Sequence, residues 1–137
     1  MARILGIDFG EKRVGLALSD RLNLIASPYK TIQYISEDDL ISKLKKIVFK
    51  KEIETFVLGL PLNMKGGDST QTKKVRKFKK QLLKLNLPIV YEDERFSSIV
   101  AKNSLVLQKV KTGHNKAEID RTAAAIILQQ YLDKNSS

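Results

Sequence analysis

Acidic side chains stand at three points of the chain where an apolar or small-residue environment surrounds them. Asp8 lies inside the apolar run 3–9, and Asp93 and Glu94 follow the apolar run 88–92. Asp120 lies in a helical segment rich in alanine. A carboxylate in such surroundings is costly unless it is paired or bound to a cation. The structural alternatives are a turn cap, a surface ion pair and an acid at a helix N-terminus.

A gathering of three carboxylates points to a hard divalent cation. Like charges held within a few ångströms repel one another and shift their pKa values. Mg²⁺ or Mn²⁺ relieves that repulsion because both prefer oxygen ligands. Two such ions about 4 Å apart can activate a water and stabilise the leaving oxygen of a phosphodiester. The chemistry predicted for Asp8, Asp120 and one of Asp93 and Glu94 is therefore metal-dependent phosphodiester hydrolysis.

The charge balance predicts a polyanionic partner. The chain has 25 Lys and Arg against 15 Asp and Glu, a formal net charge of +10. Such a surplus attracts nucleic acid, although a soluble lysine-rich surface is the plain alternative. The segment 73–84 has seven basic and no acidic side chains. It is either a substrate-binding surface or a solvated helix face. Basic residues that we expect to contact nucleic acid also flank the acids: Lys12 and Arg13 near Asp8, and Lys109, Lys111 and Lys116 before Asp120.

Several classes of site are excluded by composition. The chain has no cysteine, so disulfides, thiolate zinc sites and a thiol nucleophile are ruled out. Its single histidine, His114, cannot form a multi-histidine metal site. No apolar run approaches the ~18 residues of a membrane span. The first carboxylate comes too early for a signal peptide. We expect one cytoplasmic domain over residues 1–137.

Periodicity predicts a mixed α/β sheet that would hold these side chains. A hairpin comes first, and strands and helices then alternate, which is typical of helices packed on a sheet whose later strands are parallel. The expected strands are 3–9, 14–19, 28–35, 55–60 and 88–92, and the expected helices begin near Ser36 and at 71–86, 97–108 and 117–133.

Faces of these elements decide which acids can meet. Ligands of an open α/β sheet gather at the carboxyl ends of its strands. Neighbouring residues of a strand point to opposite faces, so only one of Asp93 and Glu94 can easily join Asp8. Ala117, Asp120 and Ala124 share one helix face through spacings of three and four. We therefore expect Asp120 to point at the sheet.

Four segments together resemble the YqgF family, also called RuvX, whose members are described as pre-16S rRNA nucleases or Holliday junction resolvases. Any one of them is a weak signal, but they follow in order along nearly the whole chain. The segments are GIDFGEKRVGLALSD (6–20), GLPLNM (59–64), DERFSS (93–98) and DRTAAAIILQQYL (120–132).

The resemblance implies a ribonuclease H-like fold, a cytoplasmic protein and processing of the 5′ end of the small-subunit rRNA precursor. It implies catalytic acids at Asp8, Glu94 and Asp120, and so selects Glu94 over Asp93. Nucleic-acid contacts are expected at Arg95 and in the loop that contains Asn63 and Lys65. There the family usually continues with Asp-Gly after the Asn-Met pair, whereas this chain has Lys65 and Gly66.

Three other functions fit parts of the sequence. The segment 6–10 also resembles the first phosphate loop of the actin, Hsp70 and sugar-kinase ATPases, but a later glycine-rich adenosine motif is missing. A non-catalytic nucleic-acid-binding or ribosome-assembly module fits the charge but not the carboxylates. A Holliday junction resolvase shares the proposed chemistry and acts as a dimer, yet no dimer seam is evident. The chain is expected to be a monomer or a homodimer.

Overall fold

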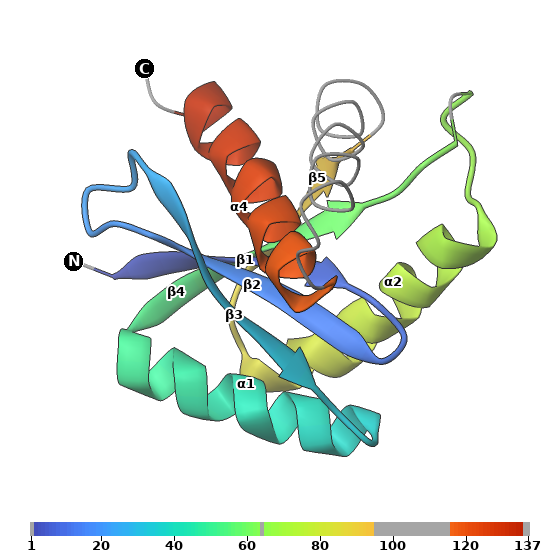
Figure 1. Ribbon diagram of the computed structural model, residues 1–137, viewed down its shortest axis with the longest axis horizontal. Helices are drawn as coiled ribbons and strands as arrows, with labels where there is room; N and C mark the ends of the chain where they lie inside the picture. Colours follow the sequence, from blue (N-terminus) through green and yellow to red (C-terminus); the bar gives the residue numbers. More distant parts are fainter. Residues whose placement is uncertain (1, 64, 95–115, 136–137) are drawn as a thin grey trace.

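A five-stranded mixed sheet organises the chain. The computed structural model describes residues 2–63, 65–94 and 116–135. Within them the strands stand in the order β3-β2-β1-β4-β5 (Figure 1). The strand bounds are β1 Arg3–Phe9, β2 Arg13–Ser19, β3 Ala26–Gln33, β4 Ile53–Leu60 and β5 Ile89–Asp93.

The pairing confirms the expected hairpin followed by parallel strands. β1 runs antiparallel to β2, and β2 antiparallel to β3, while β1, β4 and β5 run parallel to one another. The third strand begins at Ala26, before the expected start at Pro28. Pro28 is tolerated inside it because β3 is an edge strand, and the register shifts where Ala17 faces Pro28 and Leu16 faces Lys30.

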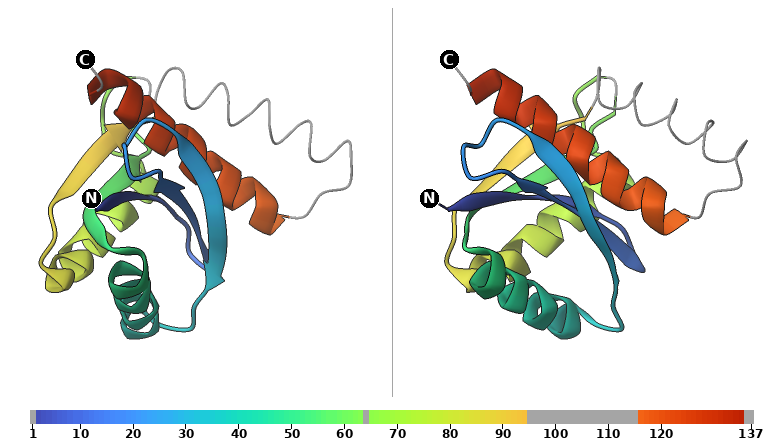
Figure 2. Two further views of the ribbon diagram at one scale, coloured as in Figure 1. Left: turned by 90° about the vertical axis from the view of Figure 1, so that its left-hand side faces the viewer. Right: turned by 60° about the vertical axis from the view of Figure 1, so that its left-hand side comes forward.

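Helices cover both faces of the sheet. α1 (Glu37–Lys51) and α2 (Thr70–Leu82), followed by the short helix η1 (Leu83–Leu85), bury apolar side chains against one face. α4 (Lys116–Asn135) packs on the other face, as both views of Figure 2 show. The helix expected at 97–108 lies outside the described residues. None of the described helices combines the length and apolar character that a membrane crossing needs.

α4 approaches the sheet closely because glycines face it. A Cβ added to Gly15 of β2 would lie 2.1 Å from the Asp120 carbonyl oxygen. A Cβ added to Gly6 of β1 would lie 3.1 Å from the Ala124 carbonyl oxygen. On the helix side, Ala123, Ala124 and Ala125 are buried. Small residues on both surfaces therefore let the helix backbone lie almost against the strands.

A buried carboxylate ties α4 to β5. Glu92 is 1% exposed, and its Oε2 accepts a hydrogen bond from Gln130 and forms an ion pair with Lys134 at 2.9 Å. The Gln130 side-chain amide also donates to the Asp93 carbonyl oxygen at 2.9 Å. A buried charge is tolerated when it is paired and hydrogen-bonded in this way. The contact fixes the far half of α4 against the strand that leads to Glu94.

We expect Gly15→Ala to destabilise the protein because its new methyl group would collide with helix backbone, which cannot swing aside. The loss should reach at least the ~1–3 kcal/mol typical of overpacking. Chemical denaturation followed by circular dichroism measures it. Gly67→Ala is the control, since the atoms nearest to its Cβ belong to the Asn63 side chain, the closest at 3.1 Å, and not to backbone. Equal unfolding free energies for the two variants would contradict this packing.

We expect Gln130→Leu to lower the unfolding free energy by about 1–3 kcal/mol, because it removes a hydrogen-bond donor from a buried carboxylate. The double variant Glu92→Leu/Gln130→Leu should recover part of that loss, since two apolar side chains replace the polar pair. The same denaturation experiment, run as a double-mutant cycle, measures the coupling. Strictly additive losses would show that the two side chains do not depend on each other.

Candidate active site

Asp8 and Asp120 line one polar pocket, which we call the acidic pocket. Asp8 lies near the end of β1, two residues after Gly6, so its side chain faces α4. Asp120 reaches the same place from the first half of α4. The pocket measures about 370 Å³, and its lining also includes Lys12 and Arg13. The expectation that Asp120 points at the sheet is confirmed.

Arg13 forms an ion pair with Asp120 in this pocket. Its Nε donates to Asp120 Oδ2 at 2.7 Å, with the two side chains 31% and 23% exposed. Arg13 begins β2, two residues before Gly15, which pairs with Asp8 of β1. The residue expected to contact nucleic acid therefore also neutralises one of the two carboxylates.

Glu94 lies on the same side of the sheet. It is 4% exposed, and its backbone N–H donates to the Leu60 carbonyl oxygen at 3.3 Å, so it extends the β5 ladder. A Cβ added to Gly59 would lie 3.0 Å from Glu94 Oε2, which means that the carboxylate occupies the space above this glycine. Since Ile7 pairs with Leu58, Asp8 and Gly59 come next to each other on the two parallel strands.

The three acids share a face but are not gathered into one cluster of ligands. Within residues 2–63, 65–94 and 116–135, no three Asp, Glu or His side chains lie close enough together to hold a metal ion. Asp8 and Asp120 share the pocket, whereas Glu94 does not line it. The structure therefore brings two of the expected ligands together and sets the third on the adjoining strands.

Three side chains hold the β1–β2 turn beside the pocket. Gln71 of α2 donates to the Phe9 carbonyl oxygen at 3.0 Å, and Tyr34 donates to that of Gly10 at 2.6 Å. Lys74 of α2 forms an ion pair with Glu11. Burial and the nearby Glu37 raise the pKa of Tyr34, so its phenol remains a neutral donor. The turn that carries Lys12 and Arg13 is thus anchored from two sides.

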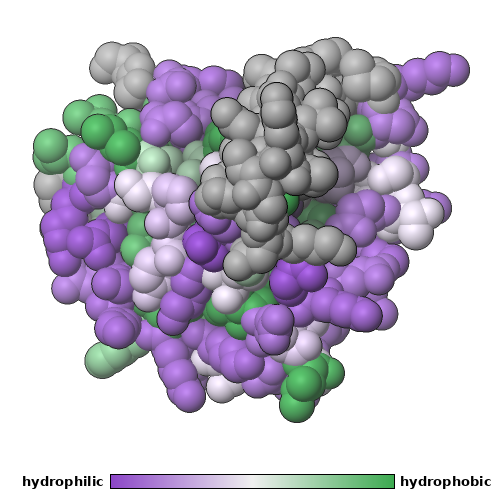
Figure 3. Space-filling view, in the orientation of Figure 1, coloured by the Kyte–Doolittle hydropathy of each residue, from purple (hydrophilic) through white to green (hydrophobic). Residues whose placement is uncertain are grey.

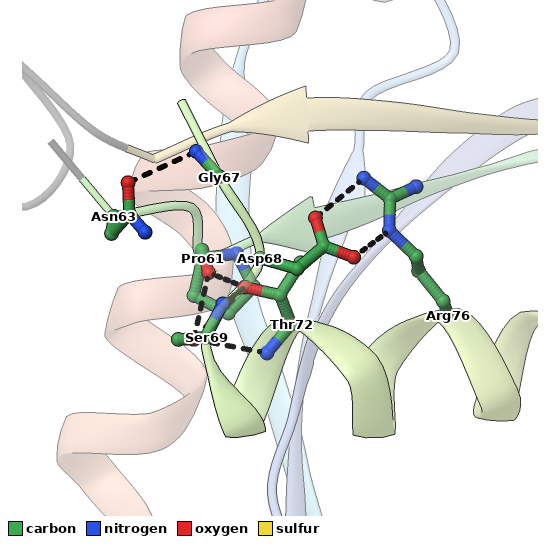
Figure 4. A network of polar contacts seen from close by, with 7 residues as sticks. All are labelled: Pro61, Asn63, Gly67, Asp68, Ser69, Thr72 and Arg76. Atoms are coloured by element: carbon green, nitrogen blue, oxygen red, sulfur yellow. Dashed lines mark hydrogen bonds and ion pairs between the residues drawn. The ribbon is translucent and has the colours of Figure 1, made fainter. Parts of the chain in front are cut away.

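The loop after β4 is organised by its own polar side chains (Figure 4). Asn63 Oδ1 accepts hydrogen bonds from the backbone N–H groups of Lys65 and Gly67, at 3.0 and 2.9 Å. Ser69 and Thr72 form a reciprocal capping box at the start of α2. The Asn63 side chain therefore stabilises the conformation of this loop. Its expected contact with nucleic acid stays a prediction.

Part of the basic surface of α2 is engaged within the protein. The Arg76 guanidinium donates to both carboxylate oxygens of Asp68, at 2.7 and 3.1 Å, and this contact lowers the pKa of Asp68 (Figure 4). Lys79 lies 4.7 Å from the centre of the Tyr91 ring. Some of the seven basic side chains at 73–84 therefore stabilise the fold as well as adding charge.

The structure describes only some of the other residues that are expected to contact nucleic acid. Lys12 lines the acidic pocket, and Lys65 is exposed in the loop after β4. Arg95, Lys109 and Lys111 lie outside the described residues. Lys116 begins α4, but its side chain is not among those described.

The structure adds one polar contact near Glu94 that the sequence does not predict, between Gln130 of α4 and Glu92 and Asp93 of β5. The sequence places Glu92 in the last strand and Gln130 in the last helix, and gives no link between them. Because side chains alternate between the two faces of a strand, Glu92 of β5 and Glu94, which follows it, lie on the same face of the sheet. That alternation is the only sign in the sequence that Glu92 lies near the site. Gln130 carries no such sign, because no local pattern shows which strand a helix residue will reach.

A protein family and several named relatives match this chain over nearly its whole length. The family described as "RuvX: Holliday junction resolvase" matches residues 2–134. Relatives named "Putative pre-16S rRNA nuclease" include one from Trichormus variabilis, 43% identical over 94% of this chain and 86% of its own length. Another, from Crocosphaera subtropica, is 44% identical over 95% and 92%.

Solved structures match the fold at low sequence identity. T. thermophilus RuvC in complex with a Holliday junction substrate has a TM-score of 0.61 at 12% identity, covering 98% of this chain and 95% of its own. The fowlpox virus Holliday junction resolvase has a TM-score of 0.54 at 13% identity, covering 96% and 99%. Together with the family match, these likenesses lead to one conclusion: the chain belongs to the RuvX family and has a ribonuclease H-like fold.

Proposed function

We propose that the protein is a nuclease that hydrolyses phosphodiester bonds at the Asp8–Asp120 pocket with Mg²⁺ or Mn²⁺. The observation that carries the proposal is the meeting of these two carboxylates, distant in sequence, in one polar pocket of a chain with net charge +10. Acidic groups in a basic protein would repel a phosphate substrate unless a cation intervened. The family and the names of the relatives support the same activity.

The donor set fits a hard divalent cation. Asp8 and Asp120 supply carboxylate oxygens in one polar pocket, and these two residues would hold the metal. Glu94, on the same side of the sheet but outside the pocket lining, would serve as a further ligand only if its carboxylate moved toward them. The bound cation would activate a water and offset the charge that develops on the phosphate.

Arg13 and Lys12 are the residues of the pocket that would bind the phosphate of the substrate. A guanidinium can pair with a phosphate through two parallel hydrogen bonds, and Arg13 carries such a group in the pocket lining. Its present partner is Asp120. Because Arg13 and a bound cation would share the Asp120 carboxylate, Arg13 would be available to pair with a phosphate when Asp120 holds the cation. Lys12, in the same lining, adds a second positive charge.

The proposed substrate is the precursor of the small-subunit rRNA, processed at its 5′ end in the cytoplasm. Relatives at 43% and 44% identity bear the pre-16S rRNA name, which supports RNA as the natural substrate. The family description instead names a DNA junction. The two substrates differ in form, so one set of cleavage assays separates them.

Asp8→Asn and Asp120→Asn should each abolish Mn²⁺-dependent cleavage of a labelled rRNA precursor fragment, lowering the rate at least ~100-fold. Each change removes a negative ligand while keeping the side-chain shape, so nucleic-acid binding should persist. Asp38→Asn, an exposed change in the first turn of α1, is the control and should cleave normally. Gel-resolved cleavage with and without chelator measures the rates.

Each outcome of this assay decides between named functions. Cleavage by Asp120→Asn at the wild-type rate would remove that residue from the site. Binding without cleavage by the wild-type protein would favour a non-catalytic nucleic-acid-binding module. Symmetric cleavage of a synthetic four-way DNA junction, with the rRNA fragment left intact, would favour a resolvase.

Arg13→Gln should tighten Mn²⁺ binding roughly two- to fivefold, because the guanidinium no longer competes for Asp120; this range matches the ~0–1 kcal/mol of a part-exposed ion pair. Isothermal titration calorimetry measures the dissociation constant. Arg21→Gln is the matched control, since Arg21 pairs at 3.0 Å with Glu52, which is not part of the pocket lining. Weaker Mn²⁺ binding by Arg13→Gln would contradict the competition.

A further inference from the structure

Two further hollows on the surface follow the acidic pocket. That pocket shares Lys12 and Arg13 with a second hollow of about 510 Å³. The second hollow shares Gln33 and Lys43 with a third, of about 520 Å³, between β3 and α1. Shared lining residues mean that the three hollows lie next to one another on the surface, in an order that a bound polymer could follow from the acidic pocket.

The third hollow, which we call the β3–α1 groove, is basic. Its lining includes Lys30 from β3 and Lys43, Lys46 and Lys50 from α1, and no acidic residue. Figure 3 shows a predominantly hydrophilic surface over this part of the molecule. A concave surface with charge of one sign concentrates its field and attracts the opposite charge more strongly than a flat one.

The lysines of the groove differ in how far they are engaged. Lys43 pairs with Asp39 at 3.1 Å and donates to the Gln33 carbonyl oxygen at 2.9 Å, so it is partly neutralised. Lys46 and Lys50 are exposed, and neither forms an ion pair with another described residue. These two ammonium groups provide most of the available positive charge of the α1 wall.

The spacing suits a nucleic-acid strand. Positions 43, 46 and 50 follow one another at three and four residues, so they lie along one face of α1. From 43 to 50 the helix rises about 10 Å, which corresponds to roughly three steps of a stacked strand at ~3.4 Å each. At the opposite wall Tyr29 has Lys30 and Lys51 at 5.4 and 5.5 Å from its ring centre. These contacts bring the Lys30 ammonium group to the wall opposite α1, so the groove carries positive charge on both sides.

We propose that the β3–α1 groove binds the phosphate backbone of the nucleic-acid strand whose scissile bond lies in the acidic pocket. This inference rests on the proposed nuclease function and extends it, because it assigns the path of the substrate beyond the site. It also assigns that path to α1 and the edge strand β3, whereas the densest basic segment of the sequence is on α2.

The test compares two charge-matched double variants. Lys46→Gln/Lys50→Gln removes two charges from the groove, and Arg21→Gln/Lys45→Gln removes two exposed charges outside its lining. Binding of a fluorescent single-stranded RNA of about 20 nucleotides is measured by anisotropy, in chelator, over a series of salt concentrations. Chelator prevents metal-dependent cleavage, so the result does not depend on the proposed catalysis.

The groove variant should bind about tenfold more weakly near 0.1 M salt. Its log–log salt dependence should become shallower by about 1.4, the value for two lost phosphate contacts at ~0.7 each on a single strand. The control should stay within about twofold of wild type with an unchanged slope. Equal losses in both variants would overturn the groove assignment, because they would reflect net charge alone. A separate failure of Asp8→Asn to abolish cleavage would count against the nuclease site and leave the groove result standing.

Discussion

The near contact between the α4 backbone and the sheet is the constraint on which the rest of the structure depends. Gly6 and Gly15 present no side chain toward the helix, and the buried alanines of α4 complete the fit. A helix held at ordinary distance from the strands would leave Asp120 away from Asp8. Gly59 extends the same arrangement to β4, where the Glu94 carboxylate and Ile127 fill the space above it. Packing of small residues thus determines where charged groups meet.

Charge is balanced locally around this contact. Arg13 offsets Asp120 at one end of α4, and Lys134 with Gln130 offsets the buried Glu92 toward the other end. The two arrangements differ in exposure, since the first pair is partly open to solvent and Glu92 is almost fully buried. A buried pair is costly to break and therefore fixes geometry, whereas a part-exposed pair can exchange partners at low cost. The Glu92 contacts therefore hold α4 in place beside β5, whereas the Arg13–Asp120 pair can exchange partners in the pocket.

The basic surplus of the chain serves more than one purpose. On α2, Lys74 and Arg76 form ion pairs with Glu11 and Asp68, and so anchor the turn and the loop that border the site. On α1, Lys46 and Lys50 line a groove that adjoins the acidic pocket through shared residues. Local sequence density of lysine is therefore a poor guide to where a polyanion binds, because it does not reveal which ammonium groups already have partners.

The sequence by itself determined the elements and the candidate acids. Apolar runs and helical spacing located the strands and described helices to within a few residues, since both periods are local properties of the chain. Alternation along the last strand restricted the choice between Asp93 and Glu94. Only the tertiary structure decided that Arg13 pairs with Asp120 and that Gln130 reaches Glu92. These contacts join segments that are distant in the sequence, and their placement follows from how closely α4 packs against the sheet, a distance that no local pattern encodes.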